Sequence, residues 1–483
     1  MQLRYRTVWR FVGFSWFLLG AGMLVSSLWA NVYGDGGYTV LRWLGSYLLL
    51  AGGFLFFVYR NNTEIRLRES YLITALTFVT CIFWGGLPLI FHRTSPSPLD
   101  GWFEAASAIT ANGLFVYPNP EVLPHALQFW RLLMQWLGGF GILALGASIL
   151  PSLGGTGHQL LRVESGSGAF DTISLRSKHA IGWIWLVYLV ITIVMFLLLQ
   201  FLEMPLFEGL CLTLSTVSTG GLPVTADGFA PFRHPLTLEI VTFFMIISSI
   251  SYLLLLQGVR GDFTAPLRSK VLQSYLLYLL ILSVLAMFIL EPLQGSYDWN
   301  AAKTVVFHVC SAATTTGFQS DTTLSNWPAA AQSLLVLAMA IGGMAGSLAG
   351  GIKFHRIVLL LKQIRSTLRR SIHPSAILGM EIDGRFIPQS TVSDVLSFLS
   401  LSLFFTLLLL LAITWSGLDW ETAISTGVAA ISGGGIGLGS AAIGTGCSTF
   451  PPTAKAFLIL GMIFGRVEFF AFFALLSRTF WRG

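Results

Sequence analysis

The sequence predicts an all-α polytopic membrane protein. We expect four repeats of a span, a re-entrant loop and a second span in a pseudo-fourfold arrangement, plus two extra N-terminal transmembrane helices. Three observations predict this class. Of 483 residues, 54% are hydrophobic and 10% charged, against about 25% charged in soluble domains. Apolar stretches of about 20 residues, long enough to cross a bilayer, recur along the chain. Four outer loops share one pattern, a short half-polar helix ending in glycine.

Ten apolar stretches are expected to cross the membrane. The first begins at Phe11 after a short basic N-terminus. It is longer than the apolar core of a signal peptide, which has about 7–15 residues, so we expect a retained helix. The predicted spans are residues 11–31, 39–59, 70–92, 128–150, 181–202, 236–257, 272–291, 329–361, 392–416 and 455–478.

Basic residues predict the orientation of these spans, because loops rich in Lys and Arg stay in the cytoplasm. Arg4, Arg6 and Arg10 precede the first span, and the segment from Lys353 to Arg385 holds seven Lys or Arg residues. The alternate loops carry acidic residues instead. This bias predicts a multi-pass protein with both termini cytoplasmic. It also accounts for the net charge of +6 without nucleic-acid binding.

Nothing in the sequence indicates an enzyme. We find no Ser/His pair, paired carboxylates or metal-ligand spacing at membrane depth, and we expect His308 to be a buried structural side chain. There is no phosphate-binding P-loop motif, so nucleotide control would need another chain. The cysteines lie far apart in or beside apolar segments, where cysteine fills space as a small hydrophobe. They are Cys81, Cys211, Cys310 and Cys447. We expect no covalent cofactor.

The four patterned loops define an internal repeat. They read DGWFEAASAITANG (100–113), PLFEGLCLTLSTVSTGG (205–221), DWNAAKTVVFHVCSAATTTG (298–317) and DWETAISTGVAAISGGG (419–435). Their closing glycines lie 108, 96 and 118 residues apart, and such self-similarity indicates repeated structural units. The predicted division is two N-terminal helices in residues 1–66, then repeats at 67–165, 166–265, 266–385 and 386–483.

The short helices predict what these loops surround. A helix of about 11 residues rises about 16 Å, so it reaches only halfway through the bilayer. Irregular backbone at that depth is tolerated only where protein buries it or where it lines a water-filled cavity. Four such loops can meet on one axis, where carbonyl rings replace the hydration shell of a cation. The alternative is that the glycines are helix caps or helix contacts. An organic-solute transporter would show two inverted halves instead.

The same stretches carry a family resemblance. FEAASAITANG, LSTVSTGG, ATTTGF, IGGMAGSLAGGIKFHRI and MIFGRVEFF resemble segments of the Trk-type bacterial potassium uptake proteins, the TrkH/TrkG membrane subunits of the Trk/Ktr/HKT superfamily. The resemblance covers nearly the whole chain. It implies span–pore-loop–span repeats around one gated pore that takes up K⁺ across the bacterial inner membrane. It also implies a homodimer and a cytosolic, nucleotide-binding, TrkA-like regulatory subunit.

The resemblance places a selectivity filter at each closing glycine and the three residues ahead of it, whose carbonyls would coordinate K⁺. These residues are Thr110, Ala111, Asn112 and Gly113; Ser218, Thr219, Gly220 and Gly221; Thr314, Thr315, Thr316 and Gly317; and Ser432, Gly433, Gly434 and Gly435. In the fourth loop, the glycine run leaves the position of the filter open by one residue. Extra glycine there, and Ala-Asn in the first loop where Thr-Thr is usual, predict a looser filter. Na⁺ conduction, or weak K⁺/Na⁺ selectivity, is therefore the alternative.

The resemblance also implies a gate. Five glycines interrupt the eighth span and cannot hold a stable helix. They are Gly342, Gly343, Gly346, Gly350 and Gly351. A gating loop below the filter is expected, with a helix-packing motif as the alternative. Lys353 either anchors this loop or reaches the cytoplasmic surface. Arg466 is expected near the axis as an electrostatic barrier, or paired with Glu468. The basic segment Lys362–Arg370 would meet anionic membrane lipid or an acidic partner.

Overall fold

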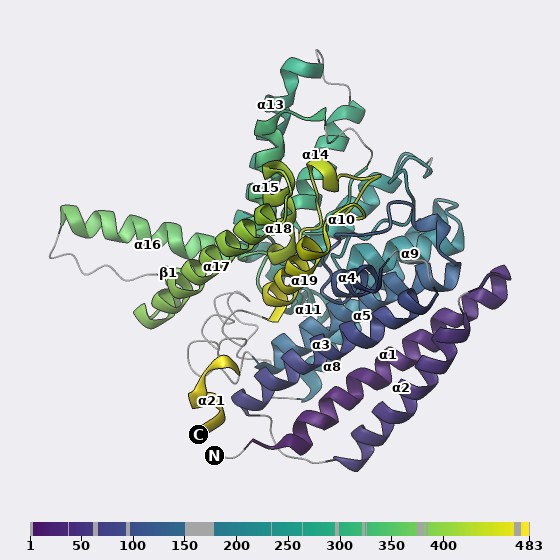
Figure 1. The fold of residues 1–483 in the computed structure, drawn as a ribbon. Coiled ribbons are helices and arrows are strands. Elements are labelled where there is room, and N and C mark those ends of the chain that lie inside the picture. The colour runs from purple at the N-terminus through teal and green to yellow at the C-terminus, as the bar shows by residue number, and fades with distance from the viewer. Residues whose placement is uncertain are drawn as a thin grey trace.

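The computed structural model is helical almost throughout (Figure 1). One short antiparallel hairpin, β1 (Glu381–Ile382) with β2 (Arg385–Phe386), lies at the predicted boundary between the third and fourth repeats. The structure describes residues 3–36, 38–60, 66–92, 97–149, 178–232, 234–262, 264–294, 299–320, 324, 326–373, 381–382, 385–467 and 475–482. The all-α polytopic class is therefore confirmed.

Two N-terminal helices, α1 (Tyr5–Tyr33) and α2 (Tyr38–Val58), run side by side at one edge of the molecule (Figure 1). Glycines let their backbones touch. A Cβ added to Gly20 of α1 would lie 2.6 Å from the carbonyl oxygen of Gly45 in α2, so a larger side chain cannot fit there. Close approach through small residues is how helices commonly associate where water provides no hydrophobic drive.

The rest of the chain repeats one order of elements, a long helix, a short buried helix and a further helix. The first repeat has α3 (Leu67–Phe91), α4 (Pro98–Ile109), η1 (Pro120–Val122) and α5 (His125–Ile149). The second has α8 (Lys178–Phe201), α9 (Leu206–Val217), α10 (Thr237–Ser248), α11 (Tyr252–Val259) and α12 (Thr264–Arg268). The third has α13 (Lys270–Gln294), α14 (Trp299–Ala313), α15 (Ala329–Ile341) and α16 (Phe354–Ile372). The fourth has α17 (Gln389–Trp415), α18 (Trp420–Ser432), η4 (Gly439–Ala441) and α19 (Pro452–Val467), and α21 (Arg478–Arg482) follows.

The short helices have the length expected of half-membrane segments. Helices α4 and α9 have 12 residues each, α18 has 13 and α14 has 15. At 1.5 Å per residue they rise about 18–23 Å, less than the hydrocarbon layer of about 30 Å. Two of them begin with a side-chain cap: Ser97 accepts from the Asp100 N–H, and Asp419 accepts from the Thr422 N–H. Each cap fixes where its half-helix starts.

The spans are partly as expected. Within the described residues, six helices are long and apolar enough to cross a membrane (α1, α2, α3, α8, α13 and α17). The expected span 236–257 is bent, because α10 and α11 meet at 102°; together they are apolar enough for one broken span. The interruption expected in span 329–361 is present, since α15 ends at Ile341. Of the expected last span, 455–478, the structure describes a helix to Val467, and residues 468–474 lie outside the described residues. The ten-span count and the repeat boundaries stay predictions.

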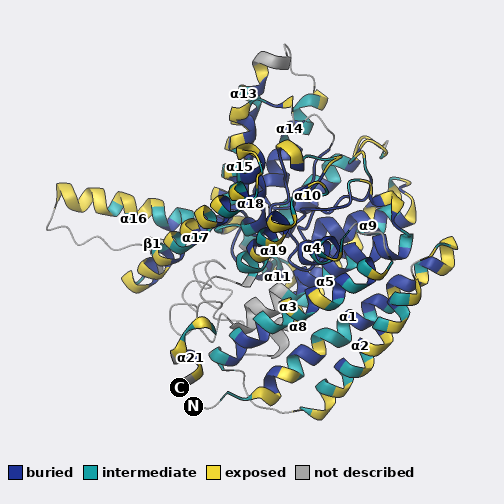
Figure 2. Ribbon diagram, in the orientation of Figure 1, coloured by how far each residue is buried: buried dark blue, intermediate teal, exposed yellow. Residues whose placement is uncertain are grey.

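Burial is distributed as a membrane environment requires. The half-helices α4, α9, α14 and α18 are almost wholly buried after their first turns, and Figure 2 shows buried residues gathered where the repeats meet. Large apolar side chains face outward instead, for example Phe288 of α13 and Leu411 of α17. Helix α16 projects away from the body (Figures 1 and 2). Phe480 packs against Val8 and Val12, so the two ends of the described chain are neighbours.

Candidate ion pathway

The loops after the four half-helices share one backbone conformation. In each, the N–H just before the closing glycine donates to a carbonyl of the half-helix. The bonds run from Asn112 to Ser107 (2.8 Å), Gly220 to Ser215 (3.0 Å), Thr316 to Ser311 (2.9 Å) and Gly434 to Ala429 (3.2 Å). Because the pattern is the same in all four, Gly435 is the structural counterpart of Gly113, Gly221 and Gly317.

Each loop places two residues in the left-handed region, separated by one residue. The first of the two is Ala111, Thr219, Thr315 or Gly433, with φ of 48°, 54°, 54° and 74°. The second is the closing glycine, Gly113, Gly221, Gly317 or Gly435, with φ of 88°, 67°, 87° and 65°. Residues other than glycine rarely adopt this conformation, and Thr219 and Thr315 are β-branched, so each is a local strain held by its surroundings.

The closing glycines form a ring. A Cβ added to Gly113 would meet the carbonyl oxygen of Gly220, and one on Gly221 would meet that of Thr316. A Cβ on Gly317 would meet the carbonyl oxygen of Gly434, and one on Gly435 would lie 2.7 Å from that of Asn112. Each repeat therefore presents the carbonyl before its closing glycine to the glycine of the previous repeat. The four loops converge on one centre in the order of the chain.

A second ring consists of hydrogen bonds between neighbouring repeats. The bonded residues come after the closing glycines of their own repeats. The Gln128 amide donates to the Val224 carbonyl (2.7 Å), joining repeats one and two. The Phe229 N–H donates to Ser320 (2.9 Å), joining two and three. The Gln319 amide donates to Gly437 (3.2 Å), joining three and four. The Cys447 N–H donates to Phe115 (2.7 Å), joining four and one.

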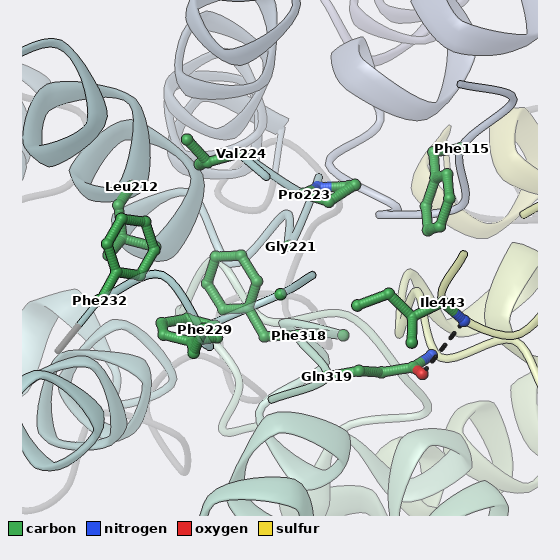
Figure 3. Close-up of a pocket in the computed structure, with 12 residues that line it drawn as sticks. Phe115, Leu212, Gly221, Pro223, Val224, Phe229, Phe232, Phe318, Gln319 and Ile443 are labelled. Atoms are coloured by element: carbon green, nitrogen blue, oxygen red, sulfur yellow. Dashed lines mark hydrogen bonds between the residues drawn. The ribbon is translucent and has the colours of Figure 1, made fainter. Parts of the chain in front are cut away.

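A small cavity of about 20 Å³ lies against Gly221 and Gly317 (Figure 3). Its walls are mainly apolar side chains from loops beyond the closing glycines, and they come from all four repeats. Figure 3 shows Phe115, Pro223, Phe318 and Ile443 around it, with Gln319 turned toward Ile443. The Gln319 side-chain oxygen accepts from the Ile443 N–H at 3.4 Å. This cavity lies beside the closing glycines at which the loops converge.

The glycine-rich segment 342–353, named the gate loop after the role expected of it, directly contacts the predicted filter loops on the side away from this cavity. The Gly350 N–H donates to the Thr315 hydroxyl (2.6 Å), and the Gly351 N–H donates to the Ser432 carbonyl (2.7 Å). Gly342, Gly346 and Gly351 have positive φ. The alternative interpretation is that these glycines form a helix-packing motif. It does not fit, because the segment is not helical and bonds to two of the predicted filter loops.

Two basic side chains hold this loop. The Lys353 ammonium donates to the carbonyls of Ala349 and Ser347, so it anchors the loop. The Arg466 guanidinium donates to the carbonyls of Thr110 and Ala111 in the first filter loop, and to Leu348 in the gate loop (2.9 Å). Arg466 thus contacts both the first of the convergent loops and the gate loop, and its expected role as an electrostatic barrier stays a prediction. Its suggested partner Glu468 lies outside the described residues.

The sequence-based prediction missed a second broken helix against the gate loop. The turn between α10 and α11 presents the Ser249 carbonyl to the Met344 N–H (3.0 Å), and the Tyr252 N–H donates to Gly346 (2.9 Å). The Tyr275 hydroxyl donates to the Ser249 hydroxyl at 3.0 Å. The available signal was the Ser-Ser-Ile-Ser run of residues 248–251 inside an apolar stretch, because Ser can satisfy backbone groups where a buried helix breaks.

Known proteins share this architecture. A family profile described as "Cation transport protein" (TrkH) matches residues 44–479. The Trk system potassium uptake protein TrkH of Salmonella typhimurium strain LT2 is 32% identical, over 99% of this chain and 100% of its own length. The chain belongs to the TrkH family of cation transport proteins. The Escherichia coli K12 proteins TrkH and TrkG are 31% and 27% identical, over 99% and 90% of this chain and 100% and 90% of their own lengths.

A solved structure agrees with the fold. The crystal structure of the potassium transporter TrkH from Vibrio parahaemolyticus superposes with a TM-score of 0.89 at 28% identity, covering 99% of this chain and 100% of that one. The family resemblance expected from the motifs is therefore confirmed. The prediction that the chain is not an enzyme is also confirmed, because the family is one of transport proteins.

Buried charges of this TrkH-family chain brace the first half-helix. The Arg131 guanidinium of α5 donates to the Glu104 carboxylate of α4 (Nε to Oε1, 2.7 Å), and both side chains are 0% exposed. The other Glu104 oxygen accepts from the Val116 N–H at 2.8 Å, just beyond the filter. Lys455 of α19 pairs with Asp100 at 2.6 Å, which ties repeat four to repeat one. These pairs fix the position of α4 rather than meet an ion.

Polar groups of the third half-helix have equally local roles. Nδ1 of His308 donates to the Thr304 carbonyl (2.8 Å), and its Nε2 accepts from the Ser320 N–H (3.3 Å). The ring is buried and acts structurally, as predicted. Lys303 forms an ion pair with Glu239 of α10 and lies over the Trp299 ring. It therefore links repeats two and three at the rim instead of approaching the axis.

Proposed function

We propose that this protein takes up K⁺ through a gated central pore with a selectivity filter lined by backbone carbonyls. One observation carries the proposal: the carbonyls of Asn112, Gly220, Thr316 and Gly434 converge on one ring. The relatives named potassium uptake proteins indicate which cation is carried.

The chemistry of the ring suits a dehydrated monovalent cation. Carbonyl dipoles replace the water that the ion sheds, so entry requires no charged side chain. The C-terminal ends of α4, α9, α14 and α18 point at the ring, and the negative end of each helix dipole favours a cation there. Glycine at the closing positions leaves room for the ion and for the neighbouring loop.

The gate loop closes the pathway on the inner side of the filter. It bonds to filter loops three and four through Thr315 and Ser432, while Arg466 bonds it to loop one. A guanidinium at this depth would repel an approaching cation, which supports the proposal that these contacts belong to a closed state. Opening requires the segment to move away from all three contacts, and its glycines permit such backbone changes.

We also propose that the protein acts as a homodimer in the bacterial inner membrane, with both termini cytoplasmic. Helix α16 extends away from the body and exposes an apolar stripe, which a second copy could cover; it consists of Leu361, Ile364, Leu368 and Ile372. Its basic residues suit anionic lipid head groups. A TrkA-like cytosolic subunit would supply nucleotide control. A single-chain mass in mild detergent would contradict the dimer.

Ion flux into proteoliposomes tests the function. Purified protein is reconstituted, and uptake of Rb⁺, as a K⁺ substitute, is measured against an equal gradient of Na⁺. Faster Rb⁺ uptake supports the K⁺ filter. Equal or faster Na⁺ uptake would favour the second candidate, a Na⁺-conducting or weakly selective transporter, for which the three consecutive glycines of the fourth loop are the supporting observation. No cation flux in either direction would overturn the proposal.

A further inference from the structure

The fourth filter loop lacks a bond that stabilises the second and third loops. Six residues before the closing glycine, Ser215 and Ser311 donate their hydroxyls to the carbonyls just after that glycine, at Leu222 (3.1 Å) and Phe318 (2.7 Å). The counterpart in the fourth loop is Ala429, which has no hydroxyl. The first loop has Ser107 at this position, but its hydroxyl is buried without a partner among the described residues, so the first and fourth loops both lack this bond.

Other internal support is weaker at the same place. The Ser432 hydroxyl is buried and has no partner among the described residues, whereas its counterparts Thr110 and Ser218 bond back to their own half-helices. Within the run, the Gly433 and Gly434 N–H groups donate to Ala429 and the Ile436 N–H donates to Gly434; the next side-chain support comes beyond the run, where the Leu438 N–H donates to Ser425 at 3.0 Å. Three consecutive glycines have the greatest backbone freedom of any tripeptide, so this loop needs an outside constraint to keep one shape.

A neighbouring repeat supplies that constraint. The side-chain amide of Asn112 donates to the carbonyls of Ala429 (2.9 Å) and Ala430 (3.0 Å) at the end of α18. The Ala429 carbonyl also accepts from the Gly433 and Gly434 N–H groups, so Asn112 adds a side-chain donor to the backbone bonds that end α18. Asn112 is 1% exposed, so the bonds are shielded from water.

The bond is specific to this position. The counterparts of Asn112 are Gly220, Thr316 and Gly434, and only Thr316 has a side chain. The Thr316 hydroxyl bonds to Thr314 within its own loop at 2.9 Å, so it does not reach across. Of the four equivalent residues, Asn112 alone has the length and the two donors to span from one repeat to the next.

We infer that the side chain of Asn112 is a selectivity-determining brace for the fourth loop, in addition to the role of its carbonyl in the filter. It constrains the fourth loop from repeat one, at the carbonyls of Ala429 and Ala430, in a loop where Ala429 cannot make the serine bond of loops two and three. Because it fixes the end of α18, it fixes where the carbonyls of Ser432 to Gly434 lie. This reverses the expectation that Ala-Asn and the extra glycines make a looser filter. The inference rests on the proposed function, since it concerns selection among cations at that filter.

The test compares cation selectivity in variants. The wild type, Asn112→Ala, and Asn112→Ala combined with Ala429→Ser are reconstituted, and the Rb⁺/Na⁺ uptake ratio is measured for each. Asn112→Ala should lower the ratio by about tenfold, which equals about 1.4 kcal/mol, the contribution of one or two buried hydrogen bonds. Ala429→Ser should restore most of the ratio, because its hydroxyl can donate to Ile436 as Ser311 does to Phe318. A purely structural role would lower the amount of folded protein without changing the ratio.

Asn119→Ala is the matched control, because Asn119 is exposed in an outer loop and bonds only locally, to the Glu121 N–H. Its ratio should equal the wild-type ratio. If Asn112→Ala does not fold, Asn112→Thr is read by the same criterion. An unchanged ratio in a folded Asn112 variant overturns the brace while leaving the filter intact. Absence of Rb⁺ uptake by the wild type overturns the proposed function, and the brace falls with it.

Discussion

Replacing Gly221 with alanine should block ion uptake, because the ring has no room for a methyl group. The added Cβ would collide with the Thr316 carbonyl oxygen and lie 2.7 Å from its carbonyl carbon and 3.1 Å from that of Gly317. These atoms belong to the next filter loop, so they cannot yield without moving a coordinating oxygen. The residue also has φ of +67°.

The magnitude follows from two separate terms. A left-handed conformation costs a residue other than glycine about 1–2 kcal/mol. Forcing a methyl group into a packed site costs about 1–3 kcal/mol more. If the packing cost of about 1–3 kcal/mol appears as distortion of the ring, the ion binds about 5- to 150-fold more weakly. Uptake should fall by at least that range, because the ion must pass this ring.

Gly34→Ala separates the two terms. Gly34 ends α1 with φ of +69°, nearly the value at Gly221, yet nothing lies within 4 Å of an added Cβ. The control should therefore lose about 1–2 kcal/mol of stability and retain wild-type uptake. The assay is Rb⁺ uptake by cells of a host without K⁺ uptake, normalised to the amount of monodisperse protein. Wild-type uptake by Gly221→Ala would refute the convergence of the loops on an ion pathway.

Two further predictions concern the gate and the buried ion pair. Arg466→Gln should raise basal cation leak by about tenfold or more, because it removes a charge and charged hydrogen bonds to Thr110, Ala111 and Leu348; deletion of residues 345–349 should act in the same direction, and unchanged flux in both would exclude the gate. Arg131→Met should destabilise the protein by about 3–5 kcal/mol by leaving Glu104 buried without its partner. In thermal unfolding, Glu104→Gln with Arg131→Met should recover most of that loss, and a double variant as unstable as the single would contradict the pairing.

The sequence by itself determined the features that depend on local chemistry. Apolar length marks a span, a helix too short to cross marks a re-entrant loop, and a glycine at each loop end marks a backbone that needs positive φ. These signals sit within about 20 residues of each other, so they placed the filter loops, the break after Ile341 and the membrane class. Arg466 stood out because a charge inside an apolar stretch is costly.

Only the tertiary structure decided which loop meets which. Glu104 with Arg131, Asp100 with Lys455, and Asn112 with α18 join residues that are 27, 355 and about 317 positions apart in the chain. No periodicity encodes such pairs, because a contact between repeats depends on how whole helices pack. For the same reason the sequence did not predict the bend at Ser249. The carbonyl freed there accepts from the Met344 N–H of the gate loop, nearly 100 residues later. Composition suggested a loose fourth loop, whereas packing places the Asn112 amide against the end of α18.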